Sequence, residues 1–182
     1  RSDIGGPQRL ARKVALAVAC AEYYLERPIR TVLDIGCGEG AWRAPLLKLR
    51  PKLHYLGFDS SEFAVRKHGT RRNLNYAHFG NFAQLRPCPP VDLLVCADVL
   101  HYLPTRELQR GLPGLAELCG GVAFLESFAA EDEFEGDHVG FQSRPAAWYK
   151  HRFMAQGLRP VGSHCWLGPA LADQLAALET TS

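Results

Sequence analysis

Residues 32–40, VLDIGCGEG, join three glycines to two carboxylates directly after a short run that is typical of a buried strand. A glycine loop after a strand lets a ligand approach the main chain, as in nucleotide and phosphate sites. Here Asp34 and Glu39 would repel an anion. The glycines follow GxGxG spacing instead of the GxGxxG of dinucleotide sites, and the GK[ST] ending of a phosphate loop is absent. The pattern therefore favours a ligand that carries positive charge.

Another carboxylate has the spacing expected for a sugar. Asp59 follows the strand-like segment HYLGF at 54–58 and lies 19 residues after Gly40. In open α/β sheets, a carboxylate about 20 residues beyond the glycine loop binds ribose hydroxyls. A ribose joined to a cationic group without phosphate describes S-adenosylmethionine.

The elements that must position these residues alternate between strand and helix. We expect strands at 31–35, 54–58, 74–79, 91–97, 122–128 and 158–162. We expect helices at 7–26, 41–49, from Ser60 or Ser61 to Gly69, and at 105–118, 144–156 and 169–178. This alternation predicts right-handed crossovers and a Rossmann-like, doubly wound α/β domain, with a mostly parallel sheet and helices on both faces. Ligands of such sheets bind beyond the carboxyl ends of the strands, where the glycine loop lies.

Length and composition predict one domain over residues 1–182, with 1–8 as a flexible or trimmed start. A net charge of +2 excludes the basic field of a general nucleic-acid binder, and we expect the basic cluster at 66–72 to be a solvated helix end. No apolar run reaches the roughly 18 residues of a membrane span. The six cysteines form no CxxC pair, so we expect reduced thiols, a cytoplasmic location and no metal.

Over residues 30–128 the sequence resembles the class I S-adenosylmethionine-dependent methyltransferases. LDIGCGEG matches the first motif of that family, Asp59 matches its ribose-binding acid, and DLLVCADVLHYLP matches its fourth motif. The resemblance implies S-adenosylmethionine as cofactor and S-adenosylhomocysteine as product.

The resemblance also implies which residues bind the cofactor. They are Asp34, Gly36, Cys37, Gly38, Gly40, Asp59, Ser60, Asn81, Phe82, Ala97 and Asp98. Gly36 and Gly38 would let the main chain approach the methionyl group, and Asp34 would orient its ammonium. Asn81 and Phe82 match the adenine contact, where the family commonly has Asp. We expect Cys37 to fill the tight loop, because a reactive cysteine needs an electropositive setting.

Two candidate catalytic residues, His101 and Tyr102, follow the fourth motif's strand. Methyl transfer from a sulfonium is an in-line displacement that needs alignment, and it needs a base only when the nucleophile arrives protonated. The intrinsic pKa of histidine suits a base. A histidine at this position is frequent in the family whatever the substrate, which favours a structural or cofactor-lining role for His101. Tyr102 either lines the acceptor pocket or packs.

An acidic segment, EDEFEGDHVGF at 131–141, connects the fifth strand to the next helix and is expected over the edge of the site. One interpretation is a lid that attracts an amine-bearing acceptor, and the other is a solvated loop. The adjacent Asp137 and His138 point apart, so they predict no metal site. The chain end, GLRPVGSHCWLG followed by PALADQLAALE, does not show the family's final antiparallel strands. Residues 164–167 then form either a stunted strand or an unfinished edge.

The main functional hypothesis is methyl transfer to a nitrogen or oxygen of a small-molecule metabolite. An RNA or protein methyltransferase is the nearest alternative. The Asn/Asp-Pro-Pro-aromatic tetrad of many such enzymes is replaced here by ADVLHY, but other RNA-modifying members also lack it. A non-catalytic, cofactor-binding partner subunit is a further alternative. A nicotinamide oxidoreductase is disfavoured by the spacing and charge of the loop. The acceptor and the oligomeric state stay open.

Overall fold

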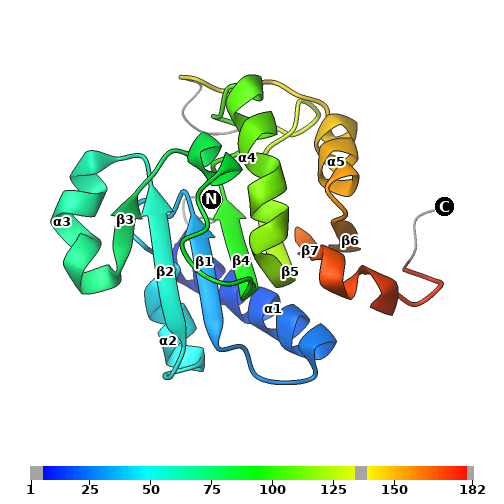
Figure 1. Cartoon of the computed structure of the whole chain (residues 1–182), viewed down its shortest axis with the longest axis horizontal. Helices are drawn as coiled ribbons and strands as arrows, with labels where there is room; N and C mark the ends of the chain where they lie inside the picture. The colour runs from blue at the N-terminus through cyan, green and yellow to red at the C-terminus, as the bar shows by residue number, and fades with distance from the viewer. Residues whose placement is uncertain (1–5, 134–138, 180–182) are drawn as a thin grey trace.

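The computed structural model describes residues 6–133 and 139–179, and its centre is a seven-stranded sheet (Figure 1). The strands are β1 (Thr31–Ile35), β2 (His54–Asp59), β3 (Leu74–Tyr76), β4 (Val91–Ala97), β5 (Cys119–Glu126), β6 (Arg159–Gly162) and β7 (Cys165–Leu167). Their order is β3-β2-β1-β4-β5-β7-β6, and among them β7 alone runs in the direction opposite to the other strands. The prediction of a doubly wound, mostly parallel sheet is confirmed.

Helices cover both faces of this sheet (Figure 1). The α-helices are α1 (Pro7–Leu25), α2 (Arg43–Leu49), α3 (Glu62–Arg72), α4 (Thr105–Leu118) and α5 (Ala146–Ala155), and two 3-10 helices are η1 (Phe79–Ala83) and η2 (Pro169–Gln174). Alternate strand residues point to opposite faces: Val32 and Leu93 pack with α1 and α2, whereas Leu33 and Leu94 pack with α4. Burial on both sides explains why β1 and β4 are almost wholly apolar.

At the end of the chain, one of the two expected alternatives for residues 164–167 is confirmed, because Cys165–Leu167 form the short strand β7. β6 and β7 form the antiparallel pair that the sequence did not show, with Gly162 opposite Cys165. Ser163 and His164 make the turn, both with positive φ (49° and 65°). Such a turn usually carries Asn-Gly, so Ser-His hides it from sequence patterns. The helix expected over 169–178 is a 3-10 helix that ends at Gln174.

Three other expected elements have wrong boundaries. The strand expected over 122–128 is β5, which begins at Cys119 and ends at Glu126. Gly69 does not stop α3, which continues to Arg72 and ends at Asn73 in the left-handed conformation that Asn tolerates (φ 57°). The strand expected over 74–79 ends at Tyr76, and the chain turns into η1. Of the two serines proposed as the N-cap, Ser61 is the cap, because its Oγ accepts the Ala64 N–H at 3.2 Å.

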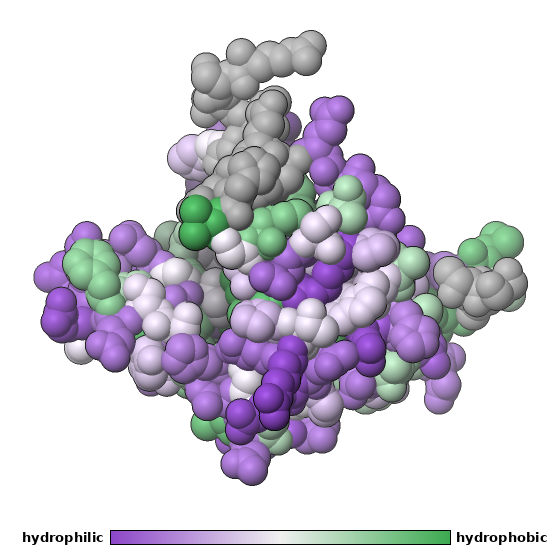
Figure 2. Space-filling view, turned by 90° about the horizontal axis from the view of Figure 1, so that it is seen from above, coloured by the Kyte–Doolittle hydropathy of each residue, from purple (hydrophilic) through white to green (hydrophobic). Residues whose placement is uncertain are grey.

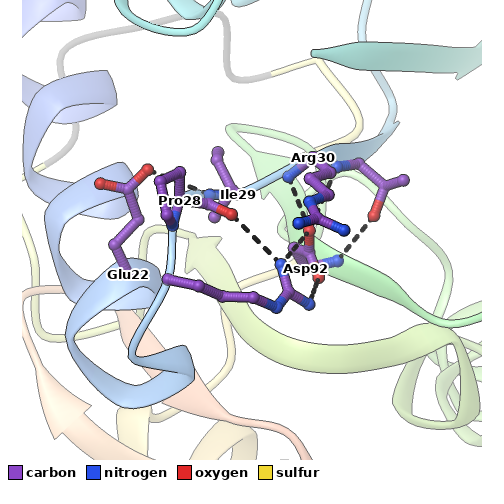
Figure 3. Close-up of polar contacts among 7 residues, drawn as sticks. Glu22, Pro28, Ile29, Arg30 and Asp92 are labelled. Carbon is purple, nitrogen blue, oxygen red and sulfur yellow. Dashed lines mark hydrogen bonds and ion pairs between the residues drawn. The ribbon is translucent and has the colours of Figure 1, made fainter. Parts of the chain in front are cut away.

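An ion-pair network fixes the amino ends of β1 and β4, at the edge of the sheet away from the glycine loop (Figure 3). The buried Asp92 carboxylate accepts hydrogen bonds from Arg27 Nη2 at 2.7 Å and from the Arg30 N–H at 2.6 Å. Glu22 of α1 accepts the Ile29 N–H at 3.0 Å and pairs with Arg50. These contacts tie the segment between α1 and β1 to the sheet.

We expect Asp92→Asn to lower the free energy of unfolding by roughly 1–3 kcal/mol at pH 7, because main-chain and guanidinium donors lose a charged acceptor. Although burial opposes ionisation, the bonds from Arg27 and Arg30 lower the pKa of Asp92. The stabilisation is therefore present above the unfolded-state pKa of about 3.9 and is lost as pH falls through the lower folded-state pKa. Urea unfolding at pH 7 and pH 3 measures this, with the exposed Asp173→Asn as control. An equal difference between Asp92→Asn and wild type at both pH values would contradict it.

Candidate active site

A cavity of about 660 Å³ opens where β1, β4 and β5 end. Four segments line it: the first turns of α1, the glycine loop, the residues after β4, and the end of β5. Figure 2 looks down on this edge of the sheet and shows hydrophilic residues gathered around its middle. The volume lies within the range of pockets that bind small molecules or cofactors.

The glycine loop is held by main-chain hydrogen bonds to β2. The N–H groups of Gly36 and Cys37 both donate to the Phe58 carbonyl, at 2.7 and 3.0 Å. Position 36 requires glycine for two reasons. Its φ is +74°, and an added Cβ would lie 2.3 Å from Val99 Cγ2. The same holds at Gly40, where a Cβ would meet the Leu74 side chain at 3.0 Å.

Gly38 is different from these two glycines. Its φ is +53°, it lines the cavity, and an added Cβ would meet no atom within 4 Å. The missing side chain therefore leaves room for a ligand instead of a neighbouring residue. Of the three glycines, Gly38 fits best the predicted role of letting a ligand reach the main chain.

Asp34 lies on the floor of the cavity and is almost fully buried. The Tyr55 hydroxyl donates to its Oδ2 at 2.6 Å. Burial raises the pKa of Asp34 to about 7, and the Tyr55 bond opposes part of this rise. Sequence reasoning missed Tyr55, because a tyrosine in a buried strand is ordinarily a core residue. Tyr55 could have been found from its position in β2, because β2 is the neighbour of the strand that carries Asp34.

Asp59 supports the glycine loop from β2. Its Oδ2 accepts the Gly38 N–H at 2.7 Å, and its Oδ1 accepts the Ser61 N–H at 2.8 Å. Asp59 is therefore beside the loop but is not part of the cavity wall, and Ser60 is exposed next to it. Ribose binding by Asp59 and Ser60 stays a prediction.

Asn81 and Phe82, the predicted adenine contact, lie in η1 outside the cavity wall. Asn81 is exposed, and its Oδ1 accepts the His78 N–H at 2.8 Å. Phe82 is fully buried and meets Phe58 edge to face at 5.5 Å. Any contact of Phe82 with a ligand would therefore come from its main chain.

The residues after β4 form a second wall. Ala97 and Asp98 line the cavity, and cofactor binding by them stays a prediction. Asp98 has φ +59°, and its N–H donates to the Glu126 carbonyl at 3.0 Å. Desolvation and the Glu126 carboxylate raise the pKa of Asp98, although Lys13 and Arg9 oppose this.

His101 and Tyr102 both line the cavity, and their rings lie 4.2 Å apart. His101 is 1% exposed, and its Nδ1 accepts the Phe128 N–H at 3.4 Å and lies 3.3 Å from Ser127 Oγ. An imidazole nitrogen that accepts a hydrogen bond carries no proton. Burial lowers the pKa of His101 and favours the neutral ring. This environment agrees better with a lining role than with a charged catalytic group.

Arg144 holds the segment that carries His101, and sequence reasoning missed it. Its buried guanidinium donates to the Leu103 carbonyl at 2.5 Å and to the Leu100 carbonyl at 3.3 Å. It also donates to Thr105 Oγ1, at 3.0 Å. An arginine just before a helix normally reads as a surface residue. The clue was the aromatic Trp148–Tyr149 pair that follows, over which the guanidinium lies.

The described part of the acidic segment has structural roles. Glu131 Oε2 accepts the Ala146 N–H at the start of α5 at 2.9 Å, and Asp132 Oδ2 accepts the Ala129 N–H at 2.8 Å. Phe141 returns to the site, with its ring 5.7 Å from His101. Phe134, Asp137 and His138 lie outside the described residues, so the lid interpretation stays a prediction.

Cys37 has the setting of an inert thiol. Burial and the neighbouring Asp34 and Asp59 carboxylates raise its pKa. Over residues 6–133 and 139–179, the structure groups no three His, Cys, Asp or Glu side chains in a way that would hold a metal. In the same residues, no helix is long and apolar enough to cross a membrane.

Residues 33–121 match the protein family described as "Methyltransferase domain". Together with the strand order and the glycine loop, this match supports the class I S-adenosylmethionine-dependent methyltransferase superfamily, which the sequence resembles.

Particular relatives agree with this class. The chain is 30% identical over 157 residues to trans-aconitate 2-methyltransferase from Azoarcus sp. (strain BH72). The aligned residues cover 82% of this chain and 58% of that protein, so the chain spans less than two thirds of that relative's length. Its fold is similar to that of a SAM dependent methyltransferase from Archaeoglobus fulgidus, with TM-score 0.68 and 17% identity over 87% of this chain and 72% of that one. The fold is also similar to that of magnesium protoporphyrin IX methyltransferase from Synechocystis PCC 6803, solved with bound SAH. The TM-score is 0.63 and the sequence identity is 24%, and the alignment covers 85% of this chain and 74% of that one.

Proposed function

We propose that the protein transfers a methyl group from S-adenosylmethionine to a nitrogen or oxygen of a small molecule. The observation that carries this proposal is the open space over Gly38, in a cavity whose floor is the Asp34 carboxylate. A cationic ligand without phosphate fits an acidic cavity in which main chain is accessible. The family match and the names of the relatives support the same activity.

The residues present fit this cofactor. Asp34 would hold the ammonium group, Gly38 would face the methionyl chain, and Asp59 would accept the ribose hydroxyls at the rim. When bound, S-adenosylmethionine supplies an activated methyl group. The chain itself has to bind, align and exclude water.

The rings of His101, Tyr102 and Phe128 lie together in one wall of the cavity. We assign this wall to orienting an acceptor beside the methyl group. Because His101 is buried and its pKa is lowered, an acceptor that arrives deprotonated, such as a carboxylate or a neutral amine, suits this wall. Carboxylate methylation also agrees with the name of the trans-aconitate relative.

Calorimetry with S-adenosylhomocysteine, followed by a screen for its release from S-adenosylmethionine with amines, phenols and carboxylates, tests the proposal. We expect binding, and turnover with one class of small acceptor. Binding without turnover on any class would favour a non-catalytic partner subunit. Activity on RNA that falls steeply with salt would favour the RNA methyltransferase alternative. Binding of NADH without S-adenosylhomocysteine would overturn the cofactor assignment.

A further inference from the structure

We infer that Arg72 and His68 of α3 are positioning residues for the glycine loop: they fix Glu39, and with it the turn that presents Gly38 to a ligand. The inference rests on the proposed function, because the ligand is the cofactor assigned to this loop. Arg72 and His68 are four residues apart in α3, so they project from the same face of the helix. Glu39 is the loop residue that both of them contact, and it lines the cavity.

Arg72 binds the main chain of the loop. Its Nη1 donates to the Glu39 carbonyl at 2.6 Å. The loop makes a tight turn here, because the Gly40 N–H donates to the Cys37 carbonyl at 2.8 Å. Gly38 and Glu39 are the two central residues of this turn. The Arg72 bond therefore fixes the orientation of a peptide group one residue beyond Gly38.

His68 contacts the side chain of Glu39. Its Nε2 lies 3.3 Å from Glu39 Oε2, which makes an ion pair when the imidazole is protonated. Nε2 is buried and has no hydrogen-bond partner in the part of the chain that the structure describes. A buried polar atom without such a partner is costly, so the nearby carboxylate is what favours this position of the ring. The carbonyl and the carboxylate of one loop residue are thus held from the same helix.

α3 is tied to the site at its start as well. It lies at the β3 edge of the sheet (Figure 1), and Ala64 alone of its residues, all of which the structure describes, is buried. Apolar packing therefore holds this helix weakly, and its polar contacts decide where it lies. At its start, the Ser61 N–H donates to Asp59 Oδ1, while Asp59 Oδ2 accepts the Gly38 N–H. α3 thus supports the turn by two routes, through Asp59 and through Glu39.

Arg72→Met tests the inference, because it removes the guanidinium and keeps most of the apolar stem. The probe is S-adenosylhomocysteine, and calorimetry measures its Kd. We expect a roughly 3- to 10-fold weaker Kd, the range for losing one hydrogen bond. Arg71→Met is the matched control, because Arg71 is the exposed neighbour in the same helix and its loss should leave the Kd unchanged. Arg72→Lys keeps a cation on a similar stem, so it should recover part of the affinity.

A double-mutant cycle tests whether His68 acts through Glu39. His68→Phe removes both ring nitrogens and keeps most of the volume of the ring. In the wild-type background we expect it to weaken the Kd for S-adenosylhomocysteine roughly 2- to 5-fold, the range for a partly exposed charge pair. In the Glu39→Ala background it should add no further loss, because the group on which His68 acts is already missing.

Two results would overturn the inference. Equal affinity for S-adenosylhomocysteine in Arg72→Met and Arg71→Met would give the Arg72 bond a structural role only, even if the melting temperature of Arg72→Met falls. An equal loss from His68→Phe in both backgrounds would show that His68 does not act through Glu39. Wild-type protein that does not bind S-adenosylhomocysteine would instead overturn the proposed function, and this inference with it.

Discussion

Gly38→Ala is expected to abolish binding of S-adenosylhomocysteine in a protein that still folds. The added methyl group meets no protein atom within 4 Å, and it projects where the cavity reaches the loop. The left-handed conformation (φ +53°) costs an alanine roughly 1–2 kcal/mol, which a domain of this size tolerates. A ligand that touches the main chain at this point would meet the new methyl group instead. Calorimetry and a thermal melt of the same sample measure the two effects.

Two other glycines serve as controls for this experiment. Gly162→Ala introduces similar strain (φ +93°) into open space away from the cavity, so it should leave binding intact. Gly36→Ala should lower the melting temperature sharply, because its Cβ would overlap Val99. Unchanged binding in Gly38→Ala would show that no ligand approaches the loop there, and the cofactor assignment would lose its main support.

The order of strands and helices was predictable because each element carries a strong local signal. β1 and β4 are apolar runs that end at Gly36 and Asp98, and α1 has a regular apolar face. The hairpin of β6 and β7 was not predictable, because its strands are four and three residues long and its Ser-His turn lacks glycine. Short antiparallel strands obtain their stability from the sheet beside them, and a local pattern does not reveal that neighbour.

The candidate site was predictable where a motif names a residue at the end of a strand or soon after it, as with Asp34, Gly38 and Asp98. It was not predictable where a residue acts from a distant part of the chain. Tyr55 reaches Asp34 from 21 positions away, and Arg144 reaches the His101 segment from beyond β5. Lys13 enters the cavity through its pair with Glu126, 113 positions along the chain. Such contacts depend on strand order and crossover, which only the folded sheet supplies.

Asp34→Asn is expected to make the protein more stable and unable to bind S-adenosylhomocysteine tightly. Burial raises the pKa of Asp34 to about 7 from an unfolded-state value of about 3.9. The folded state therefore holds its proton more tightly, and the cost of ionising Asp34 grows as pH rises between these two values. Asparagine carries no charge, so it should raise the free energy of unfolding at pH 8 by up to about 4 kcal/mol. Urea unfolding at pH 4 and pH 8 checks this, because the gain should vanish at the lower pH.

Tyr55→Phe tests whether the charge of Asp34 controls ligand binding, because Tyr55 is the hydrogen-bond donor to that carboxylate. Losing the Tyr55 bond should raise the pKa of Asp34 by about 1–2 units, the equivalent of one hydrogen bond to a charged group. Asp59, Cys37 and Cys96 also surround Asp34, and the Asp59 charge works in the same direction as the loss of Tyr55. If the ionised carboxylate holds the ligand ammonium, affinity for S-adenosylhomocysteine should fall below about pH 7 in the wild type and at a higher pH in the variant.

Tyr24→Phe is the control for this experiment. It removes a comparable tyrosine–carboxylate bond, to Glu179 at 2.9 Å, and should not move the midpoint of the pH dependence of affinity. Identical pH profiles for Tyr55→Phe and Tyr24→Phe would mean that ligand binding does not depend on the charge of Asp34.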